Sequence, residues 1–275
     1  MFFKVKLATS GIKNVPPAFS LPHEKDKLLA YAQNHPKKMF VQKSNNHRGI
    51  QVEKLENLDF NLERSFIQEF IHNPLLVDGF KFDIGLYVTL TSVDPLRIYV
   101  HQSDVQIRFC PTKYLPFDSG NRDKYVVGNN FLPSWQVPSF SKYMDRKIGF
   151  SNILEMGKNP DTMWNDIYET ISNAYQSQED QIIRAVSHYP HKDGFFEMVR
   201  FDFVIDLKVY LMEANMSPNL ASAQWPALAP LHSTDDTGDA FNVGVVSFQK
   251  QVSEEVHCNN LGAGCAMWDY DVSSV

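Results

Sequence analysis

Two carboxylates and one amide interrupt the apolar pattern of a single segment, FFEMVRFDFVIDLKVYLMEANMSPNL (residues 195–220). Alternating apolar residues predict two half-buried strands that form a β-hairpin. The first strand carries Asp202, and the second carries Glu213 and Asn215. Two carboxylates and an amide oxygen are hard ligands, of the kind that suits Mg²⁺ carrying a phosphate.

The predicted register brings these side chains together. A two-residue turn at 207–208 pairs Asp206 with Val209 and, counted back, places Asp202 opposite Glu213. Like charges that face each other directly on a sheet are destabilising. Such a pair persists if one carboxyl is protonated, if a cation neutralises both, or if both are solvated. The hairpin alone therefore leaves two interpretations open, a metal site and an edge hairpin with solvated charges and a slipped register.

A second segment, FVQKSNNHRGIQVEKL (residues 40–55), has the residue types of a phosphate-binding loop. A short apolar strand ends at Lys43, and a polar loop leads through Arg48 and Gly49 into the next strand. Backbone N–H groups of such a loop can bind phosphate oxygens, while the lysine acts as a point charge. The segment lacks the glycine spacing of a P-loop, so an ordinary hairpin turn is the alternative.

Residues 66–71, FIQEFI, form an apolar strand that Gln68 and Glu69 interrupt. A strand at the edge of a sheet has free backbone N–H and C=O groups that can bind the edge of an adenine base. A nearby polar side chain such as Gln68 could then hold the amino group of the base. A plain edge strand explains the pattern equally well.

The segment DGFKFDIGLYVTLTSVDPLRIYV (residues 78–100) predicts a long strand with one apolar and one polar face. On the polar face, Lys81 could hold a phosphate and Asp83 could orient it. The alternative is a solvent-facing strand whose Lys–Asp pair contributes little. Arg97 and Arg108 follow on the next hairpin and could supply further positive charge.

Composition bounds the class of protein. The chain has 275 residues, of which 43% are hydrophobic, with 20 Phe and 11 Tyr, so it can bury a substantial core. The net charge of -6 argues against a general nucleic-acid binder, because such proteins are basic. An acidic chain can still hold a local basic groove for an acidic partner.

Targeting signals and disulfides are not expected. No apolar run approaches the roughly 18 residues of a membrane span, and the N-terminal apolar stretch is too short for a signal peptide. The three cysteines, Cys110, Cys258 and Cys265, do not make a disulfide framework, although the last two could pair. A cytoplasmic location is the default expectation.

The order of the predicted elements favours an α+β or α/β fold. Residues 39–110 are predicted as strands and turns, 111–161 as loop-rich, and 163–189 as helical because apolar residues recur at helix spacing. The hairpin at 195–220 follows. A β-rich part, then a helix, then a hairpin is typical of a sheet with its helices segregated to one face.

Taken together, the chain resembles the tubulin tyrosine ligase-like family, which has an ATP-grasp fold. The resemblance rests on four stretches in family order between about residues 11 and 220. They are NVPPAFSLPHEKDKLL, FVQKSNNHRGIQV, FIQEFIHNPLLVDGFKFDIGLYVTLTSVDPLRIY and the hairpin quoted above. It implies an α+β, ATP-grasp-like fold with mainly antiparallel sheets and flanking helices. It also implies three parts: a remnant of the central subdomain (1–70), a catalytic subdomain (71–225) and a C-terminal extension (226–275).

The resemblance implies a role for each candidate residue. Lys43 and Lys81 would hold the ATP phosphates, and Arg108 would help to hold the phosphate or the incoming amino acid. The metal ligands for Mg²⁺ would be Asp202, Glu213 and Asn215. The remaining residues that the resemblance assigns to the nucleotide site are Arg48, Gly49, Ile50, Gln68, Phe70, Ile71, Asp83 and Asn130.

The activity that the resemblance implies is ATP- and Mg²⁺-dependent ligation of an amino acid, most simply glutamate, to the acidic tails of tubulin. The reaction runs through an acyl phosphate, and the protein would be cytoplasmic and associated with the cytoskeleton. Two alternatives stay open. One is a nucleotide-binding pseudoenzyme that binds tubulin or another acidic protein without catalysis, and the other is an ATP-grasp ligase that acts on a different carboxylate.

Three departures from the family pattern bear on these alternatives. Gly85 stands in KFDIGLYV where the family has an arginine, and the loss of a fixed guanidinium would raise the barrier to phosphoryl transfer. The family's HLTN segment is present only as VGNNFL, which keeps Asn130. The chain also starts where the family's N-terminal domain would be ending. The first two departures favour the pseudoenzyme.

Overall fold

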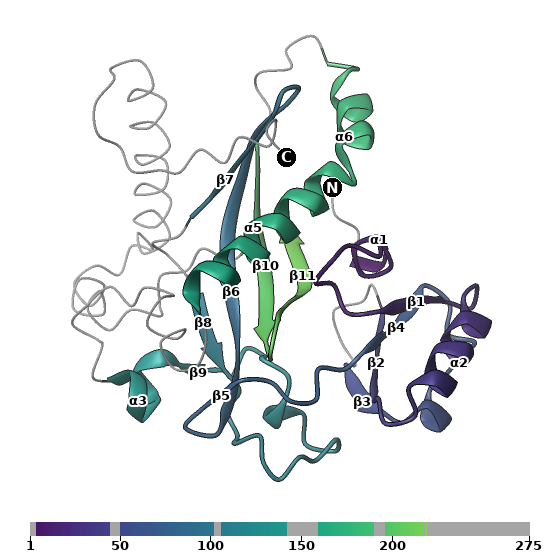
Figure 1. Ribbon diagram of the computed structural model, residues 1–275, viewed down its shortest axis with the longest axis vertical. Helices are drawn as coiled ribbons and strands as arrows, with labels where there is room; N and C mark the ends of the chain where they lie inside the picture. The colour runs from purple at the N-terminus through teal and green to yellow at the C-terminus, as the bar shows by residue number, and fades with distance from the viewer. Residues whose placement is uncertain are drawn as a thin grey trace, which may run out of the picture. The chain divides into compact units, whose positions relative to one another are not determined.

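Two antiparallel sheets and their covering helices make up the part of the chain that the computed structural model describes (Figure 1). The described residues are 4–44, 50–101, 106–141, 159–189, 196–216 and 218. The chain divides into two units, Met1–Met216 and Ser217–Val275, and only residue 218 of the second unit is described. The predicted α+β class with mainly antiparallel sheets is confirmed, whereas the three predicted domain boundaries stay predictions.

The first sheet has four strands in the order β1-β4-β2-β3. It contains a strand that the sequence analysis did not predict, within a Pro-rich stretch, and this strand covers one edge of β4. β4 therefore lies inside the sheet with all its residues buried, and the prediction of an edge strand at 66–71 is wrong. The strands are β1 (Ala18–Leu21), β2 (Phe40–Ser44), β3 (Gln51–Glu53) and β4 (Ser65–Glu69).

Helix α2 (Lys25–Asn34) closes the core of this sheet. Its Leu28 and Ala32 are buried and pack with strand residues. The core consists of Leu21, Leu28, Ala32, Phe40, Leu58 and Ile67. Since Ile67 and Gln68 are neighbours on a strand, burial of Ile67 in this core turns the Gln68 side chain to the opposite face.

The second sheet has seven strands, and β6 is its long central member. The path of paired strands runs β11-β10-β6-β8-β9, while β5 and β7 also pair with β6. Every pairing is antiparallel. The strands are β5 (Leu76–Val77), β6 (Phe80–Val93), β7 (Leu96–Val100), β8 (Gln106–Phe109), β9 (Leu132–Pro133), β10 (Glu197–Ile205) and β11 (Val209–Met216).

Helix α5 (Pro160–Gln176) crosses one face of this sheet (Figure 1). It begins after Asn159, whose side chain accepts the backbone N–H of Asp161. Its Met163, Ile167, Ile171, Ala174 and Tyr175 share one apolar core with Phe82, Ile84, Leu86, Val88, Val199, Phe201 and Phe203 of the sheet. Alternation along β6 and β10 therefore places Asp83, Gly85, Arg200 and Asp202 on the face away from α5.

The predicted helix at 163–189 is confirmed as two helices, because α6 (Glu179–Val186) starts after a break at Ser177 and Gln178. The Ser177 hydroxyl donates to the carbonyl of Ala174 and so competes with the helical hydrogen bonds. The other described helices are short: α1 (Lys4–Ala8), α3 (Pro138–Ser141), and the 3-10 turns Leu55–Asn57, Arg122–Lys124 and Ser134–Gln136. Within these ranges, no helix is both long and apolar enough to cross a membrane.

Candidate active site

The hairpin β10–β11 has the predicted pairing at its polar residues and a different one at its turn. Asp202 lies opposite Glu213, as predicted. The turn has three residues, with Ile205 paired to Val209, so the predicted pair of Asp206 with Val209 is wrong. An irregularity between Asp202 and Phe203 shifts the register by one residue. This bulge restores the pairing that a two-residue turn would have given.

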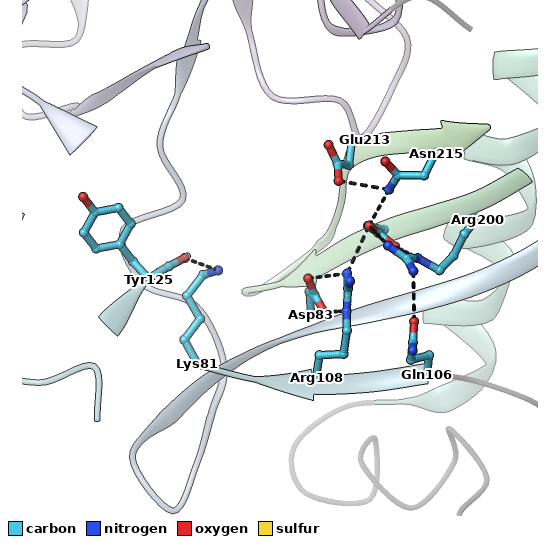
Figure 2. Close-up of polar contacts among 9 residues, drawn as sticks. Lys81, Asp83, Gln106, Arg108, Tyr125, Arg200, Glu213 and Asn215 are labelled. Carbon is cyan, nitrogen blue, oxygen red and sulfur yellow. Dashed lines mark hydrogen bonds and ion pairs between the residues drawn. The ribbon is translucent and has the colours of Figure 1, made fainter. Parts of the chain in front are cut away.

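Six side chains converge on the polar face of the second sheet and are called the charge cluster here. Its centre is Asp202, which is only 3% exposed, so the interpretation as a solvated edge carboxylate is wrong. Arg200 donates to both Asp202 oxygens, from Nε at 2.7 Å and from Nη2 at 3.0 Å. The members of the charge cluster are Asp83, Arg108, Arg200, Asp202, Glu213 and Asn215. Figure 2 labels all of them except Asp202.

Arg108 joins two carboxylates of the charge cluster. Its Nε and Nη2 donate to the two oxygens of Asp83 at 2.9 and 2.8 Å, and Nη2 also lies 3.0 Å from Asp202 Oδ2. Burial alone would lower the pKa of Arg108, but the charges of Asp83 and Asp202 raise it overall. Burial raises the pKa of Asp83 to about 6, against the lowering effect of Arg108 and with a further rise from Asp202.

Asn215 bridges the two carboxylates of the hairpin. Its Nδ2 donates to Asp202 Oδ2 at 2.7 Å and to Glu213 Oε1 at 2.9 Å. The amide group therefore lies between two acceptor oxygens (Figure 2). Rotating the amide by half a turn exchanges Nδ2 with Oδ1, because the two ends have nearly the same shape. Three oxygen ligands would then face one another, which requires a cation between them.

This donor set fits Mg²⁺. Neighbouring ligand atoms of an octahedral Mg²⁺, with bonds of about 2.0–2.1 Å, lie ~2.9 Å apart. The amide of Asn215 lies at 2.7 and 2.9 Å from the two carboxylate oxygens, which is compatible with that spacing and is also the length of an ordinary hydrogen bond, so the fit rests on the types of ligand. Within the described ranges no group of three or more His, Cys, Asp or Glu could hold a metal, so the set depends on the amide.

Lys81 lies two residues before Asp83 on β6 and turns to a different partner. Its Nζ donates to the backbone carbonyl of Tyr125 at 2.9 Å, and the residue is buried (Figure 2). The structure shows no ion pair for Lys81 within the described ranges. The Tyr125 hydroxyl in turn accepts the backbone N–H of Val52 in β3, at 3.4 Å. Tyr125 thus links the strand of the phosphate loop to Lys81.

Part of the predicted phosphate loop lies outside the described residues. This applies to Arg48 and Gly49, while Ile50 is half-buried against an apolar cluster that includes Val52 and Phe70. The flanking strands β2 and β3 pair as a hairpin, with Val41 opposite Val52. The two predicted strands are confirmed, whereas the segment between them lies outside the described residues and its role in phosphate binding stays a prediction.

Lys43 and Gln68 meet across β2 and β4. Lys43 Nζ donates to Gln68 Oε1 at 2.8 Å, and Gln68 Nε2 donates to the carbonyl of Pro16 at 3.3 Å. Phe70 and Ile71 are buried just beyond the end of β4. The backbone N–H of Phe70 donates to the carbonyl of Met39, so in this structure that N–H is not free for a base.

Two predicted residues lie apart from the charge cluster. Asn130 is exposed, and its side chain donates to Asp123 at 3.2 Å. Arg97 is exposed and pairs with Ser92, nine residues along β6 from Asp83, roughly 30 Å at the rise of a strand. Of the two arginines considered as extra positive charge, the structure brings only Arg108 to the charge cluster.

Sequence reasoning missed Arg200. It lies on the same face of β10 as Asp202, two residues away, and it is only 8% exposed. The strand pairing sets Asp202 opposite Gly85 and Arg200 opposite Tyr87. The signal was available as an arginine on the polar face of the hairpin. Its relation to Gly85 needed the pairing of β6 with β10, which no local pattern contains.

Known proteins are similar to this sequence over most of its length. The pattern of the tubulin-tyrosine ligase family matches residues 1–233. A probable tubulin polyglutamylase of Caenorhabditis elegans is 44% identical over 231 residues, which cover 81% of this chain and 45% of the relative. The matched region contains every member of the charge cluster, together with Lys43 and Lys81.

More distant relatives carry similar names. A tubulin monoglutamylase of Mus musculus is 28% identical over 224 residues, or 75% of this chain and 19% of the relative. A tubulin polyglutamylase of Homo sapiens is 29% identical over 240 residues, or 79% of this chain and 29% of the relative. The chain thus spans less than half the length of these curated relatives.

Proposed function

The chain belongs to the tubulin-tyrosine ligase family, and we propose that it is an ATP-dependent ligase that joins glutamate to tubulin tails. The observation that carries the proposal is the convergence of Asp202, Glu213 and Asn215 beside Arg108 on one sheet face. This arrangement offers cation ligands and a guanidinium in one place, as a site for phosphoryl transfer requires. The choice of tubulin and of glutamate is supported by the names of the relatives.

The proposed reaction has two steps. The γ-phosphoryl group of ATP passes to a carboxylate oxygen of the acceptor, which gives ADP and an acyl phosphate. The amine of the incoming amino acid then attacks the acyl carbon, the C–O bond to phosphate breaks, and the nitrogen loses a proton. The products are an amide bond, ADP and inorganic phosphate. Such a protein would work at microtubules in the cytoplasm.

The chain's own residues position the reactants. Lys81, held by the carbonyl of Tyr125, is a buried cation for a phosphate oxygen, and Lys43 serves the nucleotide from β2. Mg²⁺, held by Asp202, Glu213 and Asn215, supplies charge neutralisation at the phosphates when it is bound. Nη1 of Arg108 makes no hydrogen bond to a described residue, and it can hold a phosphate oxygen or the carboxylate of the amino acid.

A nucleotide-binding protein without catalysis is the second candidate. Both oxygens of Asp202 accept hydrogen bonds from the guanidinium of Arg200, and Oδ2 also contacts Arg108 and Asn215. A carboxylate with this many donors competes less well for a metal ion. This observation favours the second candidate if the donors are not displaced on nucleotide binding.

The experiment is calorimetric titration of ATP with Mg²⁺ into the 275-residue chain, followed by incubation with labelled glutamate and tubulin. Asp202→Asn and Glu213→Gln each remove one charged ligand, while Glu56→Gln alters an exposed carboxylate and serves as the control. We expect Mg²⁺-dependent ATP binding and label on tubulin for the wild type and the control only. Binding without label supports the second candidate, and no ATP binding contradicts both.

A further inference from the structure

Gly85 lies beneath the side chain of Arg200. The strands β6 and β10 pair so that Gly85 faces Asp202, with Arg200 two residues away on the same face. A Cβ atom at position 85 would lie 2.8 Å from Cδ of Arg200, and 3.2 Å from its Nε and from Asp202 Oδ1. Carbon atoms in contact are normally separated by about 3.5–4.0 Å. Any side chain at position 85 would therefore collide with Arg200.

Arg200 cannot move aside without losing its hydrogen bonds. Two of its nitrogens donate to Asp202, and Nη1 donates to Gln106 Oε1 at 3.2 Å (Figure 2). The side chain is held at its far end and runs over Gly85 in its middle. A planar guanidinium held at two carboxylate oxygens has a fixed orientation, so the absence of a side chain at position 85 is what allows this path.

We propose that Arg200 is a positioning residue of the charge cluster that supplies, from β10, the guanidinium expected at position 85. It uses the space over Gly85 to reach Asp202, and its two hydrogen bonds hold that carboxylate toward Asn215 and Glu213. The positive charge is therefore present, although the sequence pattern places it elsewhere. The role in metal and nucleotide binding depends on the proposed function, whereas the packing of Arg200 on Gly85 does not.

The proposal also explains why restoring an arginine at position 85 is not a simple repair. Two arginine side chains cannot occupy the same space, and a second guanidinium would add a like charge next to Arg200. Gly85→Arg alone should thus weaken the site. The reciprocal variant, Gly85→Arg with Arg200→Gly, removes the Arg200 side chain from the space over Gly85 and fills that space with an arginine side chain from β6. It is the variant that should recover function.

The packing is tested by a double-mutant cycle on thermal unfolding of the full chain. Gly85→Ala should lower the melting temperature by roughly 3–8 °C, because overpacking a tight contact is destabilising. In an Arg200→Ala background, the same change should lower it by less than about 1 °C, since the obstacle has been removed. An equal loss in both backgrounds would show that Arg200 is not what Gly85 accommodates.

The positioning role is tested by Mn²⁺ binding in the presence of ATP, followed by electron paramagnetic resonance. Arg200→Met keeps the length of the side chain and removes its charge, and Arg97→Met changes an exposed arginine of β7 that pairs with Ser92 near the far end of β6. We expect Arg200→Met to weaken Mn²⁺ binding about 10–100-fold and Arg97→Met to leave it unchanged. The reciprocal variant should bind more tightly than Gly85→Arg. Tighter binding by Arg200→Met would instead identify Arg200 as a competitor of the metal and overturn the proposal.

The two tests separate this inference from the proposed function. If the wild-type chain fails to bind Mn²⁺ with ATP, the proposed function fails, and so does the metal-positioning role. The thermal cycle then still decides whether Arg200 occupies the space over Gly85. Unchanged Mn²⁺ binding in Arg200→Met, with a coupled thermal cycle, would reduce Arg200 to a packing residue and reject the positioning role.

Discussion

Lys81 and Asp83 of the charge cluster have side chains on the same face of β6, but the groups that contact their charges are of opposite kinds. Lys81 is buried against a neutral backbone carbonyl. Two residues further along, Asp83 is paired with Arg108 through two hydrogen bonds. A buried cation with only a neutral acceptor keeps its attraction for an anion. The carboxylates of the charge cluster, in contrast, already contact a guanidinium or the amide of Asn215 within the cluster.

This difference indicates how one strand can serve both halves of a metal–nucleotide complex. In the proposed function, the anionic phosphates would lie by Lys81 near the start of β6, and the cation would lie by Asp202, which pairs with Gly85 four residues further along the strand. The comparison predicts that mutations in the charge cluster will mainly lower stability, whereas mutation of Lys81 will mainly weaken ligand binding. The reason is that only the charged side chains of the charge cluster contact groups of opposite charge in the absence of ligand.

The largest expected effect is on stability and comes from the centre of the charge cluster. Asp202→Ala leaves Arg200 and Arg108 buried next to each other without their shared counter-charge. Removing one partner from a buried charge pair costs about 3–5 kcal/mol. The measurement is chemical denaturation at pH 7, with Glu56→Gln as the control. A loss below about 1 kcal/mol would contradict the view that the charge cluster satisfies its own charges.

The next effect is on binding and comes from Lys81. Lys81→Met removes a buried cation that has no ion pair in the described ranges, so the free energy of unfolding should change by less than about 1 kcal/mol. ATP affinity should fall about 10–100-fold, because a charge-assisted hydrogen bond to phosphate is lost. Calorimetry measures this change, with the exposed Lys113→Met as the matched control. A large loss of stability with normal ATP binding would reverse the comparison.

A smaller effect concerns the pH dependence of stability through Asp83. Burial raises the pKa of Asp83 in the folded chain to about 6, from an ordinary value of 3.8. The folded state therefore binds this proton more tightly than the unfolded state, and the stabilisation is lost as the pH rises through about 6. Between pH 4 and 7 the contribution should fall by about 1–2 kcal/mol. The difference in unfolding free energy between wild type and Asp83→Asn, measured across that range, should show this slope. A difference that does not change with pH would mean that the pKa of Asp83 is the same in the folded and unfolded states.

Local patterns were enough to predict the hairpin and the polar face of β6. The alternation of apolar residues gave the pairing of Asp202 with Glu213, and a bulge compensated for the error in the turn. The two-faced pattern of β6 was also sufficient, because Phe82 and Ile84 enter the core while Asp83 does not. These features depend on the period of a strand, which a short stretch of sequence contains.

The features that the sequence did not reveal depend on distant pairing. β4 lies inside its sheet because β1 covers it, and β1 is hidden in a Pro-rich stretch that has no strand pattern. Arg200 and Gly85 are far apart in the chain, and only the pairing of β10 with β6 brings them together. Gly85, which stands where the family pattern has an arginine, was therefore interpreted as the loss of a positive charge. In the structure, the side chain of Arg200 reaches the space over Gly85 from the neighbouring strand β10.

The smallest expected effect comes from the outer edge of the charge cluster. Gln106 accepts one hydrogen bond from Nη1 of Arg200 at 3.2 Å, while Asp202 accepts the two shorter ones. Gln106→Ala should cost about 0.5–1.5 kcal/mol, since Arg200 keeps its bidentate pair and Nη1 can be hydrated. Chemical denaturation measures the loss, with the exposed Gln33→Ala as the control. Combined with Arg200→Met, the loss from Gln106→Ala should shrink, because its partner is already absent. A loss as large as that of Asp202→Ala would mean that Gln106 rather than Asp202 fixes the position of Arg200.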